Sequence, residues 1–349
     1  MGVAIVRTDP LMPEVEVIKK AVEVLNMGGV VAAPTETVYG LFAHAKNDVG
    51  CRKVFEIKKR PPDNPLIIHV DSIEAAREVG HISPEVERFL ERVWPGPVTV
   101  VVRSRGVVSR YATAGLDTVA IRAPAHPIPL AIIKELGAPI AGPSANRAGR
   151  PSPTTAQHVA EDLGEEVDMI VDGGPAFFGV ESTIVDMTRS PPALLRPGPF
   201  TVEELEKLLG HVEVPPAARG LVEAEKAMAP GMKYKHYAPD TPLVVVHFDV
   251  GKAAEILEAR GLRVAVLCIG ERCPKAARVL HVGGDLYEAA KNLYHALRQL
   301  DKLGVDMGLV PAVEERGLGL ALMNRLRKAA GGREVYGVEG LYGLGLGLF

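Results

Sequence analysis

Hydrophobic positions near the start of the chain follow two different periods. Between residues 14 and 27 they recur every three or four positions, which places Val15, Ile18, Val22 and Leu25 on one face of a predicted helix. Two glycines end this segment, and the apolar run at 30–33 then predicts a buried strand that leads into Pro34. A helix followed by a buried strand is typical of an α/β domain.

The same alternation continues to about residue 210. The pattern predicts a helix at 49–59 and a strand at 66–70, in which Ile67 and His69 share one face. Further strands are expected at 98–102, 118–122, 139–141, 169–171, 182–186 and 193–195, and further helices at 83–93, 128–136, 155–163 and 202–209. We therefore expect residues 1–210 to form one α/β domain.

The pattern changes near residue 211. Residues 211–242 lack periodicity and contain Pro215, Pro216, Pro230, Pro239 and Pro242, which is typical of a linker. From 243 onwards the chain predicts strands at 243–248, 263–269 and 306–310, and helices at 252–260, 286–303 and 319–330. This succession indicates a smaller C-terminal domain with an open parallel sheet. The Gly- and Leu-rich tail 342–349 is expected to be disordered or docked on a neighbour.

Length and composition narrow the class of protein. A chain of 349 residues with 47% hydrophobic and 24% charged residues fits a soluble protein of two domains. The sequence contains no apolar run of about 18 residues, so no membrane span is predicted, and the N-terminus does not resemble a signal peptide. Cys51, Cys268 and Cys273 are too few for a disulfide framework or a four-cysteine zinc site, so three reduced structural thiols and a cytoplasmic location are expected.

Charge is distributed unevenly along the chain. The net charge of −3 predicts no overall attraction to nucleic acids or anionic membranes. Residues 101–150, however, contain seven Arg or Lys and two acidic residues, whereas 151–200 contain two and eight. This asymmetry favours a local anion site.

Four polar segments adjoin predicted strands: 34–40 (PTETVYG), 58–65 (KKRPPDNP), 143–147 (PSANR) and 195–198 (LRPG). Each joins hydroxyl or cationic side chains to a Pro or Gly that constrains the backbone, so these groups are held in place before a ligand binds. Fixed cations and small hydroxyls, without a Cys or Ser nucleophile motif nearby, suit the binding and activation of a nucleoside triphosphate.

Each of these segments also has a purely structural interpretation. Lys58, Lys59 and Arg60 could cap a helix dipole, although the stiff Pro61-Pro62 pair that follows favours a polyphosphate site, where Arg supplies a planar fork and Lys a point charge. The segment 35–37 could cap a helix, with Tyr39 in the core.

The remaining candidates are equally open to two interpretations. His69 could be a hydrogen-bonded structural residue, and Arg122, at a strand end, could receive a carboxylate or form a structural ion pair. The turn at Ser144 could bind an anion through its amides or be an ordinary Ser turn, and Ser182 and Arg196 share this ambiguity.

Taken together and in order, the motifs resemble the YrdC/Sua family. They are PTETVYGL at 34–41, KKRPPDNPLIIHV at 58–70, WPGPVTVV at 94–101, DTVAIRAP at 117–124, APIAGPSANRAGRPSPT at 138–154, GVESTIVD at 179–186, LLRPGP at 194–199, GMKYKHYAP at 231–239 and GLGLALMNRLRKAA at 317–330. Because they span nearly the whole chain, the sequence resembles the long, two-domain Sua form.

The resemblance implies a fold and a reaction. The fold is a YrdC-like twisted, mostly mixed sheet with helices and a concave cavity in 1–210, a linker that acts as a lid at 211–242, and a smaller Rossmann-like Sua domain at 243–349. The reaction is L-threonylcarbamoyladenylate synthesis from L-threonine, bicarbonate and ATP with Mg²⁺, the first step of tRNA threonylcarbamoyladenosine modification. The product would pass to a TsaD-type transferase.

The resemblance also implies roles for individual residues. The residues that match the family's threonine pocket are Thr35, His69, Arg122 and Ser182. Those that match the ATP site are Arg60, Asn64, Thr118, Ser144, Ser152 and Arg196, with Lys58 and Arg60 as catalytic cations near the phosphates and with Tyr234 and His236 of the linker as further candidates. No protein-bound metal site is expected.

Two positions depart from the family pattern, and two other functions remain open. Ala229 stands where many relatives have Ser, and Gly142 where some have Thr, so no side-chain role is transferred to either. The Arg-rich stretch 101–150 would also suit weak binding of double-stranded RNA or tRNA without adenylate formation. A HypF-like carbamoyl-adenylating factor is disfavoured because such proteins carry Cys-rich zinc motifs that three scattered cysteines cannot supply.

Overall fold

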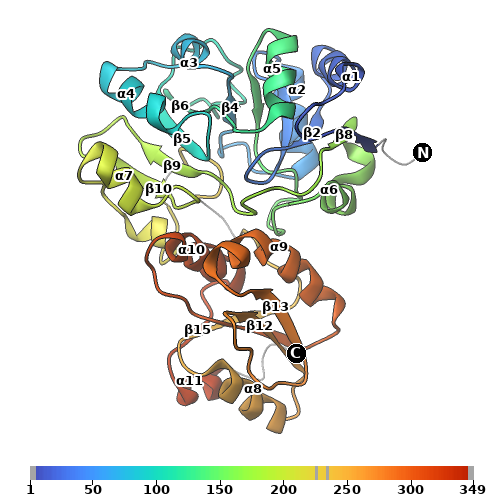
Figure 1. Ribbon diagram of the computed structural model, residues 1–349, viewed down its shortest axis with the longest axis vertical. Coiled ribbons are helices and arrows are strands. Elements are labelled where there is room, and N and C mark those ends of the chain that lie inside the picture. Colours follow the sequence, from blue (N-terminus) through green and yellow to red (C-terminus); the bar gives the residue numbers. More distant parts are fainter. Residues whose placement is uncertain (1–4, 225–226, 233–235, 345–349) are drawn as a thin grey trace. The chain divides into compact units, whose positions relative to one another are not determined.

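The computed structural model describes residues 5–224, 227–232 and 236–344 (Figure 1). The chain divides into two compact units. The first unit comprises Met1–Ala148, Ser152–Ala218 and Val222–Tyr234, and the second comprises Gly149–Pro151, Arg219–Leu221 and Lys235–Phe349. Each unit has its own sheet.

The first unit contains a mixed sheet with strand order β1-β8-β2-β3-β7-β4-β6-β5-β9-β10. Pairs such as β2–β3 and β5–β6 are antiparallel, whereas β2–β8, β4–β6 and β5–β9 are parallel, so the expected mixed sheet is confirmed. The strands are β1 (Ile5–Arg7), β2 (Val31–Pro34), β3 (Tyr39–His44), β4 (Ile67–His69), β5 (Val98–Arg103), β6 (Thr118–Arg122), β7 (Ile140–Gly142), β8 (Met169–Asp172), β9 (Thr183–Asp186) and β10 (Ala193–Arg196).

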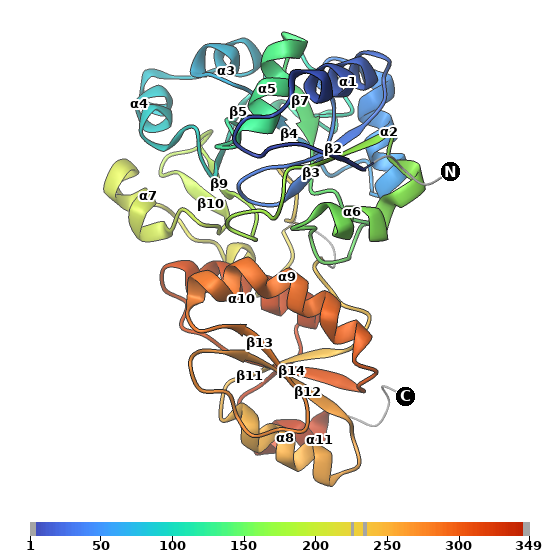
Figure 2. The ribbon, with the colours of Figure 1, turned by 45° about the vertical axis from the view of Figure 1, so that its right-hand side comes forward.

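Most helices of this unit begin at a residue whose side chain caps the helix, although the first helix begins without such a cap. Asn47, Ser72, Ser83, Thr155 and Thr201 each accept a hydrogen bond from a first-turn amide. The helices are α1 (Val15–Asn26), α2 (Asp48–Lys58), α3 (Ile73–Val79), α4 (Pro84–Val93), α5 (Pro127–Leu136), α6 (Ala156–Leu163) and α7 (Val202–Leu209), with short 3₁₀ turns at Gly164–Glu166 and Pro216–Arg219. Helices α1 and α5 lie side by side and pack on β2, β3, β7 and β8 (Figure 2).

The strand register decides which side chains share one face of this sheet. Ile67 pairs with Ala120 and His69 with Arg122, and strand alternation therefore puts all four on the same face. Ile67, Val101, Ala120 and Ile184 form an apolar floor there, on which Ala229 and Met232 pack. We call this face of β4, β6, β5 and β9 the site face.

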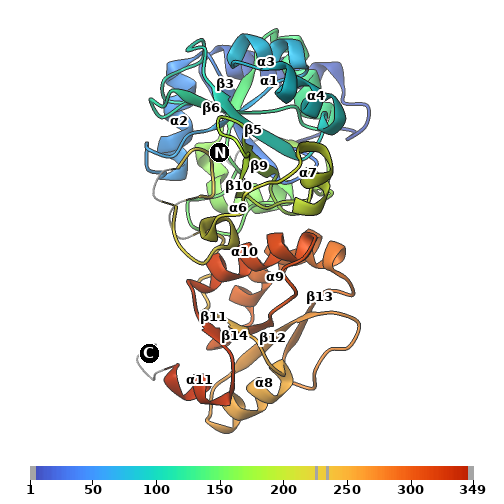
Figure 3. The same ribbon diagram turned by 90° about the vertical axis from the view of Figure 1, so that its left-hand side faces the viewer.

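The second unit contains five strands in the order β13-β12-β14-β11-β15, all parallel, as expected from its βαβ pattern. They are β11 (Leu243–Val246), β12 (Val264–Ile269), β13 (Val279–Gly283), β14 (Met307–Pro311) and β15 (Glu334–Val335). Helices α9 (Leu286–Lys302) and α10 (Leu318–Ala330) cover one face, and α8 (Val250–Ala259) and α11 (Val338–Gly343) cover the other (Figures 2 and 3).

Two sequence-based expectations need correction. Cys268 and Cys273 form a disulfide, so only Cys51 is a free thiol, and burial raises its pKa to about 12. The two residues are five positions apart, and a strand end and the loop after it bring their Cα atoms to 5.5 Å, which spacing alone does not reveal. Of the tail 342–349, the first two residues belong to a helix that ends at Gly343 and Leu344 packs against the core of the second unit, so only the disordered alternative is wrong for them, while 345–349 lie outside the described residues. Among the described residues, no helix has the length and apolar character needed to cross a membrane.

Candidate functional site

The turn between β2 and β3 holds a pair of buried hydroxyls. Thr35 Oγ1 donates to the Val38 carbonyl at 2.7 Å and lies 2.8 Å from Thr37 Oγ1. Loop 177–179 is fastened to this turn, because the amides of Phe178 and Gly179 donate to carbonyls of the turn. Strand β3 follows the turn, so the helix-cap interpretation is wrong, although Tyr39 is indeed a core residue.

Arg122 lies at the end of β6 and reaches this turn. Its Nη1 donates to Thr37 Oγ1 at 3.0 Å, and its Nη2 lies 2.6 Å from Oε1 of Glu36. The side chains of Arg122 and Glu36 are only 4% and 7% exposed, so this is a buried ion pair. Among the described residues, neither Glu36 oxygen has a well-aligned hydrogen-bond donor, which leaves the carboxylate able to accept from a ligand.

His69 stands beside Arg122 in the sheet register. Its Nδ1 lies 3.1 Å from the Ile67 carbonyl, and its ring meets Phe42 edge-on at 5.0 Å. Burial, and then the Arg122 charge, lower the pKa of His69 to about 3, so the ring is neutral. The structural interpretation of His69 therefore holds, and its place next to Arg122 also agrees with the predicted threonine pocket.

Ser182 and Arg196 contact each other at the β9 edge of the site face. Arg196 donates from Nη2 to Ser182 Oγ at 3.1 Å and from Nε to the Ser182 carbonyl at 3.0 Å. Ser182 Oγ also lies 2.8 Å from Thr99 Oγ1. The third Arg196 nitrogen, Nη1, donates to the Pro230 carbonyl at 2.9 Å, which fastens the segment 227–232 to this arginine.

Lys58 ends α2 and is almost fully buried. Its ammonium donates to the carbonyls of Ser144 and Asn146 rather than to its own helix, so dipole capping is not its main role. Burial, and next the nearby Arg60 charge, hold the pKa of Lys58 well below its usual range, and Asp162 and Glu181 oppose this shift. The lysine thus connects the 58–65 and 143–147 segments.

Arg60 and Asn64 shape the segment after α2. Arg60 donates from Nε to the Asn64 carbonyl at 3.1 Å and from Nη2 to the Pro65 carbonyl at 3.2 Å. The Asn64 side chain is buried, yet neither polar atom of its amide has a hydrogen-bond partner in the part of the chain that the structure describes. A buried amide without partners is costly in an ordinary loop and is suited to a polar ligand. Thr118, also buried, begins β6.

Two further serines belong to the same neighbourhood. Ser144 Oγ donates to the side-chain oxygen Oδ1 of Asn146 at 2.5 Å, and the Ser144 carbonyl accepts from Lys58. Ser152 donates to the buried Glu181 carboxylate. None of Ser144, Ser152 and Ser182 has a hydrogen bond to a histidine in the described structure, so none resembles an activated nucleophile.

The residues around Lys58 and those around Arg196 are linked through two consecutive residues, Glu181 and Ser182. Glu181 contacts Ser152 and acts on the charge of Lys58, whereas its neighbour Ser182 contacts Arg196. Sequence reasoning missed Glu36 and Glu181, because a carboxylate is not an obvious component of an anion site. The signal was their position inside the TET and VEST motifs. Tyr234 lies outside the described residues and His236 belongs to the second unit, so the nucleotide contacts expected of both stay predictions.

The basic stretch 101–150 offers less free charge than its composition suggests. Arg103, Arg122 and Arg147 form ion pairs with Asp117, Glu36 and Glu166 respectively. These pairs weaken the sequence-based argument for RNA binding.

A mixed α/β sheet that buries clustered cations and hydroxyls on one face suits an enzyme that binds and activates anionic substrates. Comparison with known proteins supports this class. A family model described as "Telomere recombination", which covers Sua5, YciO and YrdC, matches residues 23–198, and one described as "Threonylcarbamoyl-AMP synthase, C-terminal domain" matches 200–331. The chain therefore belongs to the Sua5–YciO–YrdC family, in its two-domain form.

Close relatives cover nearly the full length. The threonylcarbamoyl-AMP synthase of Pyrococcus abyssi is 47% identical over 324 residues, which is 90% of this chain and 94% of the relative. The enzyme of the same name from Bacillus subtilis is 43% identical, covering 94% of this chain and 97% of the relative. A crystal structure of P. abyssi Sua5 complexed with L-threonine has a TM-score of 0.91 at 44% identity, covering 96% and 99% of the two chains.

Proposed function

We propose that this chain is an L-threonylcarbamoyladenylate synthase, which converts L-threonine, bicarbonate and ATP into threonylcarbamoyl-AMP and pyrophosphate. Full-length relatives of this name, and a close structural relative that binds L-threonine, support the proposal. The observation that carries it is the junction at Glu181–Ser182, where Ser182 accepts from the buried Arg196 and its neighbour Glu181 accepts from Ser152 and acts on the charge of the buried Lys58.

In the proposed threonine pocket, Arg122 binds the carboxylate of the amino acid. Glu36, whose oxygens have spare acceptor capacity, faces the amine and compensates its charge. Thr35, neutral His69 and Ser182 surround the small side chain and its hydroxyl. Because His69 stays uncharged, it can accept or donate one hydrogen bond without repelling the ammonium or Arg122.

The reaction proceeds in two steps. The threonine amine attacks bicarbonate and water leaves, which forms an N-carboxylate. One oxygen of this carboxylate attacks the α-phosphorus of ATP, the bond between the α-phosphorus and the oxygen bridging to the β-phosphate breaks, and the β- and γ-phosphates leave as pyrophosphate. The chain then acts as a nucleotidyltransferase whose contribution is alignment and charge stabilisation, so it needs no covalent nucleophile.

The proposed nucleotide site surrounds this pocket with fixed donors. Lys58, Arg60 and Arg196 lie along the triphosphate, which brings its own Mg²⁺. Asn64, Thr118, Ser144 and Ser152 supply hydrogen bonds, of which the partnerless Asn64 amide is the most direct indication. Tyr234 and His236 of the linker stay candidates for further nucleotide contacts, and segment 227–232, which packs on the site face, is the candidate lid.

Beyond this chain, we propose that the labile product passes to a TsaD-type tRNA threonylcarbamoyltransferase in the cytoplasm, with weak RNA contact at most. The experiment that tests the function is mass spectrometry of products from ATP, threonine and ¹³C-bicarbonate. Threonylcarbamoyl-AMP carrying one ¹³C atom and pyrophosphate are expected, with much less product from serine. ATP breakdown without the labelled adenylate would contradict the proposal.

A further inference from the structure

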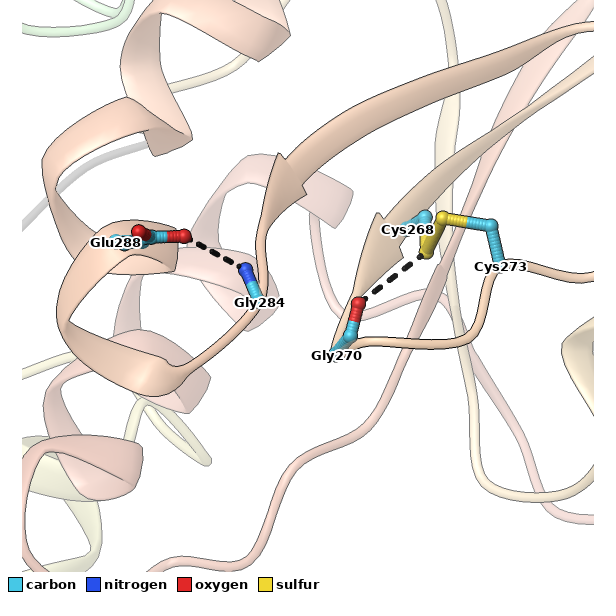
Figure 4. The surroundings of a disulfide bond; sticks show 5 residues. All are labelled: Cys268, Gly270, Cys273, Gly284 and Glu288. Atoms are coloured by element: carbon cyan, nitrogen blue, oxygen red, sulfur yellow. Dashed lines mark hydrogen bonds between the residues drawn. A yellow bond between two sulfur atoms is a disulfide. The ribbon is translucent and has the colours of Figure 1, made fainter.

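Three side chains of types that can ligate a metal ion lie together in the second unit, outside the site described above. Cys268, near the end of β12, is bonded to Cys273 in the loop that follows (Figure 4). On the adjacent strand β13, His281 stands opposite Cys268 in the parallel register. One ligand atom from each of the three residues can be chosen so that all lie within 4.8 Å of one another.

These three side chains suit one kind of ion. Zinc binds thiolate sulfur at about 2.3 Å and imidazole nitrogen at about 2.0–2.1 Å, so two of its ligand atoms can be no more than about 4.6 Å apart. The observed spacing is already close to that limit, and opening the disulfide leaves both sulfurs beside the imidazole. Thiolate and imidazole ligands favour zinc-class ions over Mg²⁺ or Ca²⁺, which prefer oxygen.

The surroundings allow an ion to enter and the ligands to adjust. Cys268 is 2% exposed, whereas Cys273 and His281 are exposed. Two ligands stand on neighbouring strands, which fixes them, and the third is on a short loop. Gly270 in this loop has φ of 116°, a value open to glycine, and its added Cβ would meet nothing within 4 Å.

We propose that Cys268, Cys273 and His281 form a redox-controlled zinc site. A dithiol or phosphine reductant supplies two electrons that break the S–S bond, and two protons complete the thiols. Binding of Zn²⁺ then releases those two protons, which gives two thiolates and one imidazole on the ion, with water in the fourth position. Oxidation by a disulfide-class oxidant restores the S–S bond and releases the ion.

The site gives the β12–β13 connection a cross-link in both redox states. In the oxidised state the disulfide closes the loop 268–273. In the reduced, metal-bound state the ion closes the same loop and additionally joins it to β13 through His281. The proposal is independent of the adenylate-forming activity, because none of its residues belongs to the first unit.

Cobalt titration of the full chain tests the proposal. The protein is reduced with a phosphine under anaerobic conditions, and Co²⁺ is added while thiolate-to-cobalt absorption is recorded. One Co²⁺ per chain is expected, with the absorption bleached by Zn²⁺. The oxidised chain is the matched control and should give no such absorption. His281→Ala should weaken Co²⁺ binding at least about tenfold, since it removes one of three ligands.

Two further variants locate the absorption. Cys273→Ser should abolish it, whereas Cys51→Ser, at the free buried thiol of the first unit, should leave it unchanged. Circular dichroism of each variant confirms folding before titration. The proposal is overturned if the reduced chain shows no thiolate–cobalt absorption, if His281→Ala binds as tightly as the parent, or if the reductant cannot open the disulfide while the chain stays folded.

Discussion

Replacing Arg122 separates threonine recognition from nucleotide binding. In Arg122→Lys the charge that balances Glu36 is kept, but the hydrogen bond to Thr37 and the planar fork available to a carboxylate are lost. Hydrogen bonds to charged groups contribute about 1.5–3 kcal/mol, which corresponds to a rise of about 10- to 150-fold in the KM for threonine. The KM for ATP should stay within about twofold of the parent value.

Arg122→Ala is a less specific change, because it also lowers the free energy of unfolding. It leaves the buried Glu36 carboxylate without its counter-charge, which costs about 3–5 kcal/mol of folding free energy. The double variant Glu36→Gln/Arg122→Ala removes the stranded charge and should recover part of this stability without recovering threonine-dependent activity. Urea unfolding measures the first effect, and pyrophosphate release at varied threonine and ATP measures the second.

The result that refutes this reasoning is an equal loss of affinity for both substrates in a folded Arg122→Lys protein. Unchanged threonine dependence would refute it as well, because Arg122 would then serve only as the partner of Glu36.

Three other predictions follow from particular contacts. Lys58→Met removes the ammonium near the predicted phosphates and should lower kcat by about 10²–10³, as for the loss of one oriented donor, while threonine binding measured by calorimetry changes little. His69 has a lowered pKa in the folded chain, so its stabilising contribution is complete above about pH 6.5 and falls as the pH decreases towards 3. Between pH 7 and 5 the free energy of unfolding of the parent should therefore fall by about 2 kcal/mol more than that of His69→Gln, as measured by urea unfolding. A Cβ at Gly198 would lie 2.4 Å from the Thr183 amide nitrogen, so Gly198→Ala should cost about 1–3 kcal/mol and reduce activity, whereas Gly343→Ala, which meets nothing within 4 Å, should change the melting temperature little.

Much of the fold could be predicted from periodicity. The long amphipathic helices α1 and α9 and the apolar strands β6 and β12 carry strong periodic signals, and all four lie where the pattern indicated. The pattern missed β3, because a polar turn precedes it and a glycine interrupts it, and it missed short elements such as β1 and α3. Such elements depend on pairing and capping partners elsewhere in the chain.

The site could be predicted in its residue types but not in its pairing. Stiff, polar segments next to strands indicated Lys58 and Arg196, and a predicted strand end indicated Arg122, yet no periodic pattern showed that Arg122 pairs with Glu36. Similarly, Ser152 and Glu181 meet only because loops far apart in sequence return to the same place. Contacts of this kind are set by the topology of the fold, which the pattern of a single sequence does not reveal.

The central claim is that one connected set of side chains on the site face serves both substrates. A crystal structure of the chain with L-threonine and a non-hydrolysable ATP analogue tests it most directly. The account predicts the threonine carboxylate within hydrogen-bond distance of Arg122, and the triphosphate in contact with Lys58, Arg60 and Arg196. Threonine bound away from Arg122, or a triphosphate that contacts none of those three cations, would contradict it.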